Sequence, residues 1–373
     1  MLPKELPKYQ ILLISPSLRG RGGVADFCKL LIQNIQINFK IDIIEVGNRP
    51  GNRFFLKRIL YFFQDNWRLF ITLMKNDYHV VHLNPSLKKL SLLRDSFYFI
   101  LSKKIFHKNV IVMFHGWDEN LASQIIKNFY WRRLFKSIYK NADSLVVLCN
   151  FYKKRLMEMG LSPERVSVLT TMYQKTEAAL PDQIPAINTA KINLLFLSRF
   201  IESKGIYIAA QVVKLLVDNG FKNFKLLFAG DGPESKGLED FIQKNQLEDY
   251  VELKGFVSGE KKREILQSSS ILLFPTFYGE GCPVAVLEAM GAGLAIVSTP
   301  VGAISEIVDH NQNGLIVDSK DPKDFFKAVQ ELIEDRDRLQ RMQRLNRQKA
   351  EENYEAKIVT QKVESIYLSI LHA

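Results

Sequence analysis

Residues 270–302 read SILLFPTFYGEGCPVAVLEAMGAGLAIVSTPVG and carry the clearest structural pattern in the chain. A short apolar run (270–276) enters a glycine-rich turn, and a helical pattern follows until Gly291-Ala292-Gly293. A second apolar run (294–299) comes next. Short runs without polar alternation are typical of parallel strands that are buried on both faces. The stretch therefore predicts a strand–helix–strand unit of a parallel sheet.

The same alternation of short apolar runs and amphipathic stretches extends along the whole chain. The runs are 9–15, 41–46, 78–84, 109–116, 143–150 and 165–170, then 192–198, 224–230, 250–256, 270–276, 294–299 and 314–317. Strands that alternate with helices form parallel sheets covered on both faces. The sequence therefore predicts an α/β fold of two doubly wound, Rossmann-like domains that face each other across a ligand-binding crevice.

One segment interrupts this pattern and suggests the domain boundaries. Residues 174–190, QKTEAALPDQIPAINTA, contain two prolines and no periodicity, which is typical of a linker. We expect an N-terminal domain at 1–175, a linker at 176–190 and a C-terminal domain at 191–354. We also expect a last helix, about 355–373, that packs back on the first domain.

Composition narrows the class of protein. The three cysteines are far apart in the sequence, which excludes a disulfide framework and a cysteine-based zinc site and favours a reducing cytoplasm. The net charge is +11, but residues 1–185 hold 28 Lys and Arg against 14 Asp and Glu, while residues 186–373 hold 23 against 26. This excess of positive charge in the N-terminal half predicts a surface that binds phosphate groups, either of nucleic acid, of anionic lipid or of a phosphorylated substrate.

The glycine-rich turn in residues 270–302 is a candidate anion site. Glu280, Gly281 and Cys282 precede a predicted helix with Pro283 at its first position, and a helix N-terminus after a glycine turn binds anions. Glu288 follows inside the helix among apolar neighbours. A carboxylate in such surroundings needs a partner, because an unpaired buried charge is costly.

Two further loops follow strands at the same predicted sheet edge. Arg199 lies just past the run 192–198 and Lys204 begins the next helical stretch, while Gly230 belongs to the tight turn 229–233. Arginine clamps phosphate oxygens with two hydrogen bonds and lysine adds a point charge. Together these loops predict a phosphate-binding site.

The first half offers a rival interpretation. Gly20, Gly22 and Ala25 fit a dinucleotide-binding fingerprint after the first strand, and Glu45 ends the next strand, which favours an NAD(P)-dependent oxidoreductase. A non-enzymatic basic protein that binds nucleic acid is a second alternative, although no nucleic-acid module is recognisable. Asp335-Arg336-Asp337 has the spacing of a metal-binding Asp-x-Asp, but its polar helical surroundings favour a solvated helix face.

The second half resembles the nucleotide-sugar domain of retaining glycosyltransferases of family 4, which have the two-domain GT-B fold. The resemblance rests on SRFIESKG, FAGDGP, GFVSG and above all EGCPVAVLEAMGAGLAIVSTPVG, and covers residues 192–317. In the first half only the glycine loop and Phe114-His115-Gly116 match. Cys282-Pro283 departs from the aromatic or glycine of many members, which leaves the identity of the sugar open.

The resemblance implies a role for each candidate residue. Arg199 and Lys204 would hold the donor diphosphate, Glu288 the ribose hydroxyls, and Glu280 with the Gly281–Cys282 backbone the donor sugar. The loop at Gly22 and Gly23, with the turn at Gly230, would approach the donor, and His115 would contact the transferred sugar. The donor is a UDP- or GDP-sugar, and no cofactor or metal is required. The implied mechanism is front-face attack, in which the leaving phosphate takes the acceptor proton.

Three stretches of the basic half mix cations with aromatic residues. They are 52–70, 87–106 and 129–140, whose apolar residues recur at helical spacing. Basic amphipathic helices with bulky aromatics suit the interface of anionic bilayers. We therefore expect a cytoplasmic enzyme that is peripheral on the inner face of the cell membrane and binds no nucleic acid. The resemblance implies a lipid-linked or saccharide acceptor, since many relatives build surface polysaccharides on lipid-linked acceptors.

Overall fold

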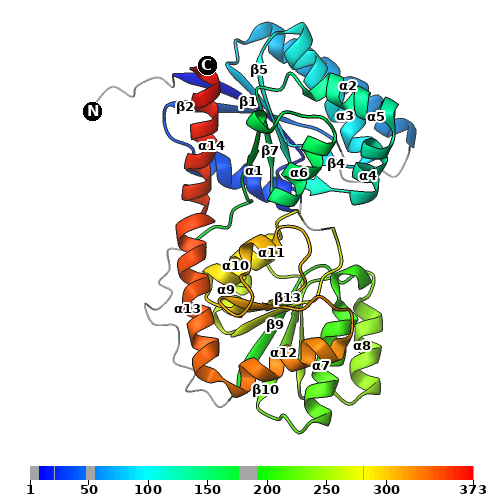
Figure 1. Cartoon of the computed structure of the whole chain (residues 1–373), viewed down its shortest axis with the longest axis vertical. Coiled ribbons are helices and arrows are strands. Elements are labelled where there is room, and N and C mark those ends of the chain that lie inside the picture. Colours follow the sequence, from blue (N-terminus) through cyan, green and yellow to red (C-terminus); the bar gives the residue numbers. More distant parts are fainter. Residues whose placement is uncertain (1–7, 21, 48–54, 176–190, 280, 373) are drawn as a thin grey trace. The chain divides into compact units, whose positions relative to one another are not determined.

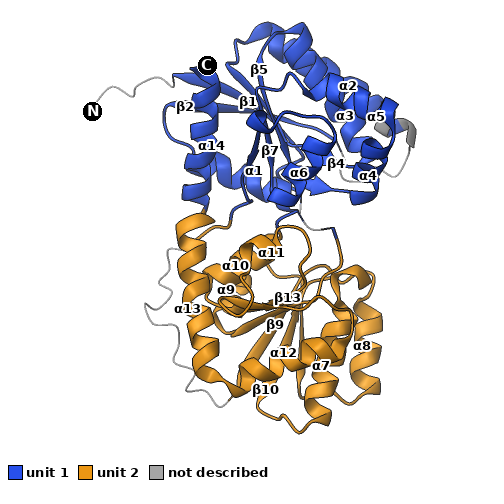
Figure 2. Ribbon diagram, viewed as in Figure 1, with its two compact units in different colours: residues 1–172, 279–282, 356–373 blue, residues 173–278, 283–355 orange. Residues whose placement is uncertain are grey.

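In the computed structural model, the described residues are 8–20, 22–47, 55–175, 191–279 and 281–372, apart from the side chains of residues 55, 56 and 58. The chain divides into two compact units (Figure 2). Unit 1 comprises residues 1–172, 279–282 and 356–373, and unit 2 comprises 173–278 and 283–355. The predicted linker at 176–190 lies outside the described residues.

Unit 1 is built on a six-stranded parallel sheet in the order β2-β1-β3-β5-β7-β8. The strands are β1 (Tyr9–Ser15), β2 (Phe39–Glu45), β3 (Val80–Leu83), β5 (Asn109–Phe114), β7 (Ser144–Val147) and β8 (Val166–Val168). The chain forms β1 first and adds β2 on one side of it. The next strand, β3, then pairs with the other side of β1, and the remaining strands follow outward from there. This reversal of strand order is the switch point at which such sheets bind ligands.

Helices flank this sheet, and one of them comes from the end of the chain (Figure 1). They are α1 (Gly23–Asn34), α2 (Phe55–Lys75), α3 (Lys89–Phe99), α4 (Glu119–Lys127), α5 (Phe129–Tyr139), α6 (Asn150–Glu158) and α14 (Ala356–Leu371). A π-helical turn, Ile100–Ile105, continues α3. In α14, Glu364 accepts a hydrogen bond from the Gln36 N–H at 2.7 Å, and the Tyr367 hydroxyl lies 2.7 Å from Nδ1 of His82.

Unit 2 repeats the plan with the sheet order β11-β10-β9-β12-β13-β14, again parallel. The strands are β9 (Ile192–Leu197), β10 (Phe224–Ala229), β11 (Val251–Gly255), β12 (Ile271–Phe274), β13 (Ala295–Ser298) and β14 (Gly314–Ile316). The helices are α7 (Ile206–Asp218), α8 (Ser235–Lys244), α9 (Gly259–Gln267), α10 (Val284–Gly291), α11 (Ile304–Ile307), α12 (Pro322–Glu334) and α13 (Arg336–Asn353).

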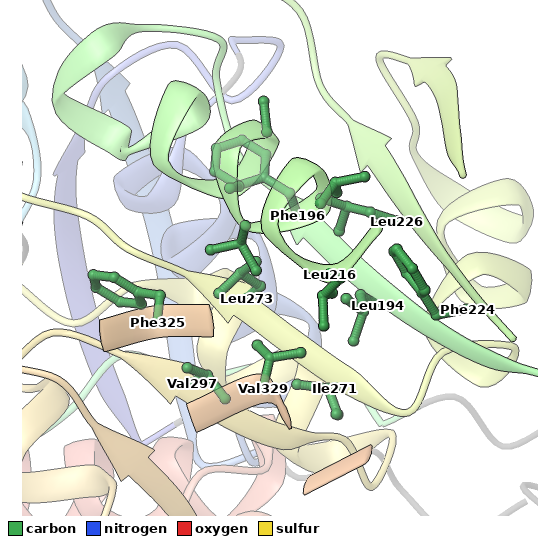
Figure 3. Close-up of a cluster of buried hydrophobic side chains, with 14 of the residues drawn as sticks. Leu194, Phe196, Leu216, Phe224, Leu226, Ile271, Leu273, Val297, Phe325 and Val329 are labelled. Atoms are coloured by element: carbon green, nitrogen blue, oxygen red, sulfur yellow. The ribbon is translucent and has the colours of Figure 1, made fainter. Parts of the chain in front are cut away.

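The core of unit 2 lies between this sheet and the helices on its face. Figure 3 shows β9 and β10 side chains such as Phe196 and Leu226 beside Leu216 of α7, with Phe325 and Val329 of α12 close by. All five side chains are buried. Burial of a large apolar side chain stabilises the fold by about 1.5–3 kcal/mol, so this cluster holds the sheet edge that carries the candidate site.

The predicted fold class is confirmed, and each of the twelve apolar runs contains all or most of one strand. The sequence did not predict the short parallel pair of β4 (Ser86–Leu87) and β6 (Gly116–Trp117). Two-residue strands carry no periodicity that could be recognised. No helix among the described residues combines the length and the apolar character needed to cross a bilayer.

Candidate active site

Lys204 is held at the C-terminal edge of the unit 2 sheet. It ends the 3₁₀ turn η3 (Glu202–Lys204) and is 8% exposed. Its ammonium lies 4.6 Å from the ring centre of Tyr278 and 5.6 Å from that of Phe274. The Phe277 N–H donates to the Ser203 carbonyl at 2.7 Å, which fastens this turn to the end of β12. The cation therefore has a defined place.

Arg199 shares the same aromatic ring. Its guanidinium carbon lies 5.8 Å from the centre of Tyr278, and the side chain is exposed. The structure thus brings together the two cations that were predicted to bind phosphate, at one ring. Cation–π contacts of this kind orient both side chains. Tyr278 was missed by the sequence analysis, although an aromatic residue in a glycine turn after a strand was a usable signal.

The loop at Gly230 lies against the segment that carries Arg199. A Cβ on Gly230 would stand 1.8 Å from the Ser198 carbonyl oxygen, and one on Gly232 would stand 2.3 Å from the Phe200 carbonyl oxygen. The Phe200 N–H donates to the Asp231 carbonyl at 2.8 Å. Only glycine permits this approach, so the two loops form one surface at the sheet edge.

Glu288 has a charged partner. It lies on α10, is mostly buried, and forms an ion pair with Lys262 of α9. The apolar neighbours indicated that a partner was needed, and Lys262 fills that need. Lys262 lies 26 positions before Glu288, so no local sequence pattern could identify it as the partner.

The segment before α10 differs from the prediction. Pro283 is the N-cap residue and the helix begins at Val284, so the N–H groups of Gly281 and Cys282 precede the helix. Gly281 packs within unit 1, where a Cβ would stand 2.6 Å from the His115 carbonyl oxygen. Cys282 is buried. Glu280 lies outside the described residues.

His115 is buried at the end of β5 in unit 1. Its Nε2 lies 2.9 Å from Oδ1 of Asn84, and the Asn84 Nδ2 donates to the Ile14 carbonyl at 3.1 Å. A carbonyl can only accept, so the amide NH₂ faces Ile14 and Oδ1 must accept from His115. Burial, with a smaller effect of His82, lowers the pKa of His115 to about 3. The imidazole is therefore neutral, with its proton on Nε2.

The glycine loop of unit 1 opens α1. Gly22 is the N-cap residue, with φ of 144° and open space where a Cβ would lie, and Gly23 is the first helical residue. From this helix the Phe27 ring meets the His115 ring edge-on at 4.7 Å. Glu45, which supported the oxidoreductase interpretation, accepts a hydrogen bond from the Leu18 N–H at 2.9 Å. That carboxylate holds the loop in place.

The Asp-x-Asp sequence has a local structural role. Asp335 is the N-cap residue of α13, and its side chain accepts from the Arg338 N–H at 2.8 Å. Among the described residues, no group of three or more His, Cys, Asp or Glu side chains is arranged to hold a metal ion.

Comparisons with known proteins identify the class to which this fold and site belong. Residues 11–172 match the family described as Glycosyltransferase Family 4, and residues 181–349 match Glycosyl transferases group 1. The chain belongs to glycosyltransferase family 4. The oxidoreductase interpretation is therefore wrong, because both halves of the chain match glycosyltransferase families.

Individual relatives are distant. WcaL of Escherichia coli K12, a glycosyltransferase provisionally assigned to colanic acid biosynthesis, is 24% identical over 79% of this chain and 71% of its own length. For three other curated relatives, the match spans 53–64% of the relative's length. Among solved structures, sucrose-phosphate synthase of Thermosynechococcus elongatus has a TM-score of 0.76 at 14% identity, covering 98% of this chain and 99% of that one. Anabaena HepE in complex with UDP-glucose has a TM-score of 0.71 at 15% identity, covering 96% and 99%. These structures share the GT-B fold.

Proposed function

We propose that the protein is a retaining glycosyltransferase that moves a sugar from a UDP- or GDP-sugar to a hydroxyl of a lipid-linked glycan in cell-surface polysaccharide synthesis. One observation carries the donor assignment. Lys204 and Arg199 meet at the ring of Tyr278, at the edge of a parallel sheet where such folds bind ligands. Two fixed cations beside glycine loops suit a diphosphate. The complex of HepE with UDP-glucose supports a nucleotide-sugar donor.

The remaining residues would complete the donor site. Glu288 would bind the ribose hydroxyls, with Lys262 holding its carboxylate in place, and Glu280 with the backbone of Gly281 and Cys282 would bind the sugar. Gly22 and Gly23 would leave room for the donor phosphate. His115, neutral and fixed in one tautomer, would accept a hydrogen bond from a sugar hydroxyl at Nδ1.

The reaction would break the bond between the anomeric carbon and the diphosphate and form a bond from that carbon to the acceptor oxygen on the same face. The departing phosphate oxygen would take the acceptor proton. Arg199 and Lys204 would stabilise the charge that develops on the diphosphate, which is the role of fixed positive groups in enzymes without a metal.

The acceptor and location are inferred from chemistry outside the donor site. WcaL is assigned by name to colanic acid synthesis, which favours a role in surface polysaccharides. The positive charge and aromatic residues of the first half favour an enzyme on the inner face of the cell membrane, where a lipid-linked acceptor would be found. In this proposal the basic surface binds anionic lipid, and the protein binds no nucleic acid.

Incubation with a panel of nucleotide sugars tests the reaction class. We expect one UDP- or GDP-sugar to release its nucleoside diphosphate, and that nucleotide to raise the melting temperature, because a ligand that binds only the folded state stabilises it. NADH and NADPH should leave the melting temperature unchanged. Stabilisation by NADH with no response to any nucleotide would contradict the proposal.

Asn84 provides a test of the role of His115. In the wild type, the neutral imidazole should give no inflection in kcat between about pH 5 and 8, because its pKa is about 3. Asn84→Asp places a carboxylate beside Nε2, which raises that pKa by favouring the imidazolium. Activity of this variant should therefore fall as the pH is lowered through its new pKa.

The control is Asn84→Leu, which removes the acceptor without adding charge. It should lower kcat by about tenfold, the typical effect of losing a positioning hydrogen bond, and leave the pH profile flat. If kcat of the folded Asn84→Asp variant does not depend on pH in this range, His115 does not take part in the reaction.

A further inference from the structure

Helix α2 of unit 1 is apolar on two opposite sides. Its inward side packs on the unit through the buried residues Leu69 and Leu73. Its outward side presents Leu60 and Trp67, which are 54% and 66% exposed, in a stripe with Ile59, Phe63 and Met74. A helix on a globular protein needs one apolar side for its core. The outward stripe is therefore surplus to the packing of unit 1.

The surplus apolar surface continues onto two neighbouring helices. In α3 and its π-helical turn, Leu90, Leu93, Phe97 and Ile100 recur every three or four residues and are exposed, as is Ile105. In α5 the exposed large apolar residues are Phe129, Tyr130, Trp131 and Leu134. Figure 1 shows α2, α3 and α5 side by side at one edge of unit 1, and the Phe62 and Phe97 rings join α2 to α3 at 5.1 Å. We call this surface the three-helix face.

The helices of the three-helix face are mostly basic, with Arg94 paired to Asp95 and Lys103 to Asp143. The segments 55–75, 89–105 and 129–139 contain eleven Lys and Arg but only two acidic residues, Asp65 and Asp95. Both carboxylates are buried. Outside these helices exposed large apolar side chains are fewer: among the described residues they are Ile37, Phe151 and Met157 in unit 1 and Leu253, Phe256 and Leu345 in unit 2. Aromatic and cationic groups are thus concentrated on one face of one unit.

We propose that the three-helix face is the surface by which the protein docks on an anionic phospholipid bilayer, with its aromatic and aliphatic side chains inserted at the interface and its cations on the lipid phosphates. This rests on the proposed function, because it gives the glycosyltransferase its place beside a lipid-linked acceptor. Surface charge alone would suit nucleic acid, but the exposed stripe would then have no use. A second copy would set the same cations against each other. A bilayer satisfies both features at once.

The tryptophans allow a direct test with the intact chain. The protein has three, of which Trp67 and Trp131 lie on the three-helix face and Trp117 is buried. Vesicles of phosphatidylglycerol and phosphatidylcholine should shift the emission to shorter wavelength, and brominated acyl chains should quench it. Vesicles of phosphatidylcholine alone should have a much smaller effect, and added salt should weaken binding. Trp67→Phe with Trp131→Phe should abolish the quenching while co-sedimentation persists.

Matched substitutions separate the apolar and the charged contributions. Leu60→Ser with Leu93→Ser should weaken vesicle binding by about tenfold or more, since each removes an inserted side chain. Arg68→Ser with Arg132→Ser should weaken it only for anionic vesicles. The control, Leu253→Ser with Leu345→Ser, removes exposed leucines of unit 2 and should bind like the wild type.

Three outcomes would overturn the proposal. The first is that the wild-type protein does not bind anionic vesicles. The second is that the substitutions on the three-helix face leave vesicle binding unchanged. The third is that the protein is a dimer in solution and the same substitutions dissociate it. Nucleotide release from the donor with a water-soluble saccharide acceptor reports on the proposed function separately. If that activity is present and vesicle binding is absent, only the docking surface is wrong.

Discussion

Lys204→Ala should reduce kcat/KM for the nucleotide sugar by about 10²–10³-fold, the usual effect of removing one fixed group that stabilises transition-state charge. The reason is the position of this lysine, which is buried and whose ammonium faces the rings of Tyr278 and Phe274. A mobile surface lysine could be replaced by its neighbours, but this one has a defined place. Initial rates of nucleotide release, over a range of donor concentrations, measure the loss.

Arg199→Ala should cost less than Lys204→Ala, because Arg199 is exposed and water partly screens its charge. The double variant should retain almost no transferase activity while circular dichroism stays that of the folded protein. Lys214→Ala serves as the control. It removes a lysine from the same unit, where it pairs with Asp218 on the surface of α7, and should leave kcat/KM unchanged. Near-normal turnover by the folded double variant would contradict the donor assignment.

Gly205→Ala should lower the free energy of unfolding by about 3 kcal/mol and sharply weaken nucleotide binding. Gly205 has a φ of 77°, and a Cβ there would stand 2.0 Å from the Pro275 carbonyl oxygen. Backbone atoms cannot rotate away as a side chain can. The turn that carries Lys204 would have to separate from the end of β12, which moves the cation. Thermal unfolding with and without UDP or GDP measures both effects.

Gly220→Ala is the control that separates the effect of the close contact with Pro275 from the effect of the left-handed backbone conformation. Gly220 has a φ of 84°, much like that of Gly205, but nothing lies within 4 Å of its Cβ position. This variant should lose only about 1 kcal/mol, the cost of a left-handed conformation in a residue with a Cβ, and should bind nucleotide normally. Equal effects of the two substitutions would show that the contact with Pro275 does not hold the site.

Local patterns made most of the fold predictable. Runs such as 192–198 and 224–230 are apolar along their whole length, and this is enough to mark strands that are buried on both faces. The glycine turn before Val284 and the run SRFIESKG could be recognised because their residues are neighbours in sequence. The excess of positive charge in the first half was also predictable, because it follows from the numbers of basic and acidic residues in the sequence.

Contacts between distant residues were out of reach. Tyr278 follows Lys204 by 74 positions and Lys262 precedes Glu288 by 26, so neither pair leaves a periodic signal. Asn84 and His115 meet because β3 and β5 are adjacent in the sheet, and only strand order places them side by side. The pKa of His115 depends on burial, which a sequence does not state.

Residue types and their spacing are sufficient to predict parallel α/β sheets and a basic, aromatic first half. They also place glycine loops with Arg199, Lys204 and Glu288 after the strands. These properties depend on residue type and spacing along a few turns of backbone. The three-dimensional packing is needed to know which apolar side of α2 is buried and which residues pair with Glu288 and His115. Both sides of α2 carry the same kinds of residue, and the packing of the sheet selects one of them. The physical reason is that burial and pairing are properties of three-dimensional neighbours, which strand order and helix packing bring together from distant parts of the chain.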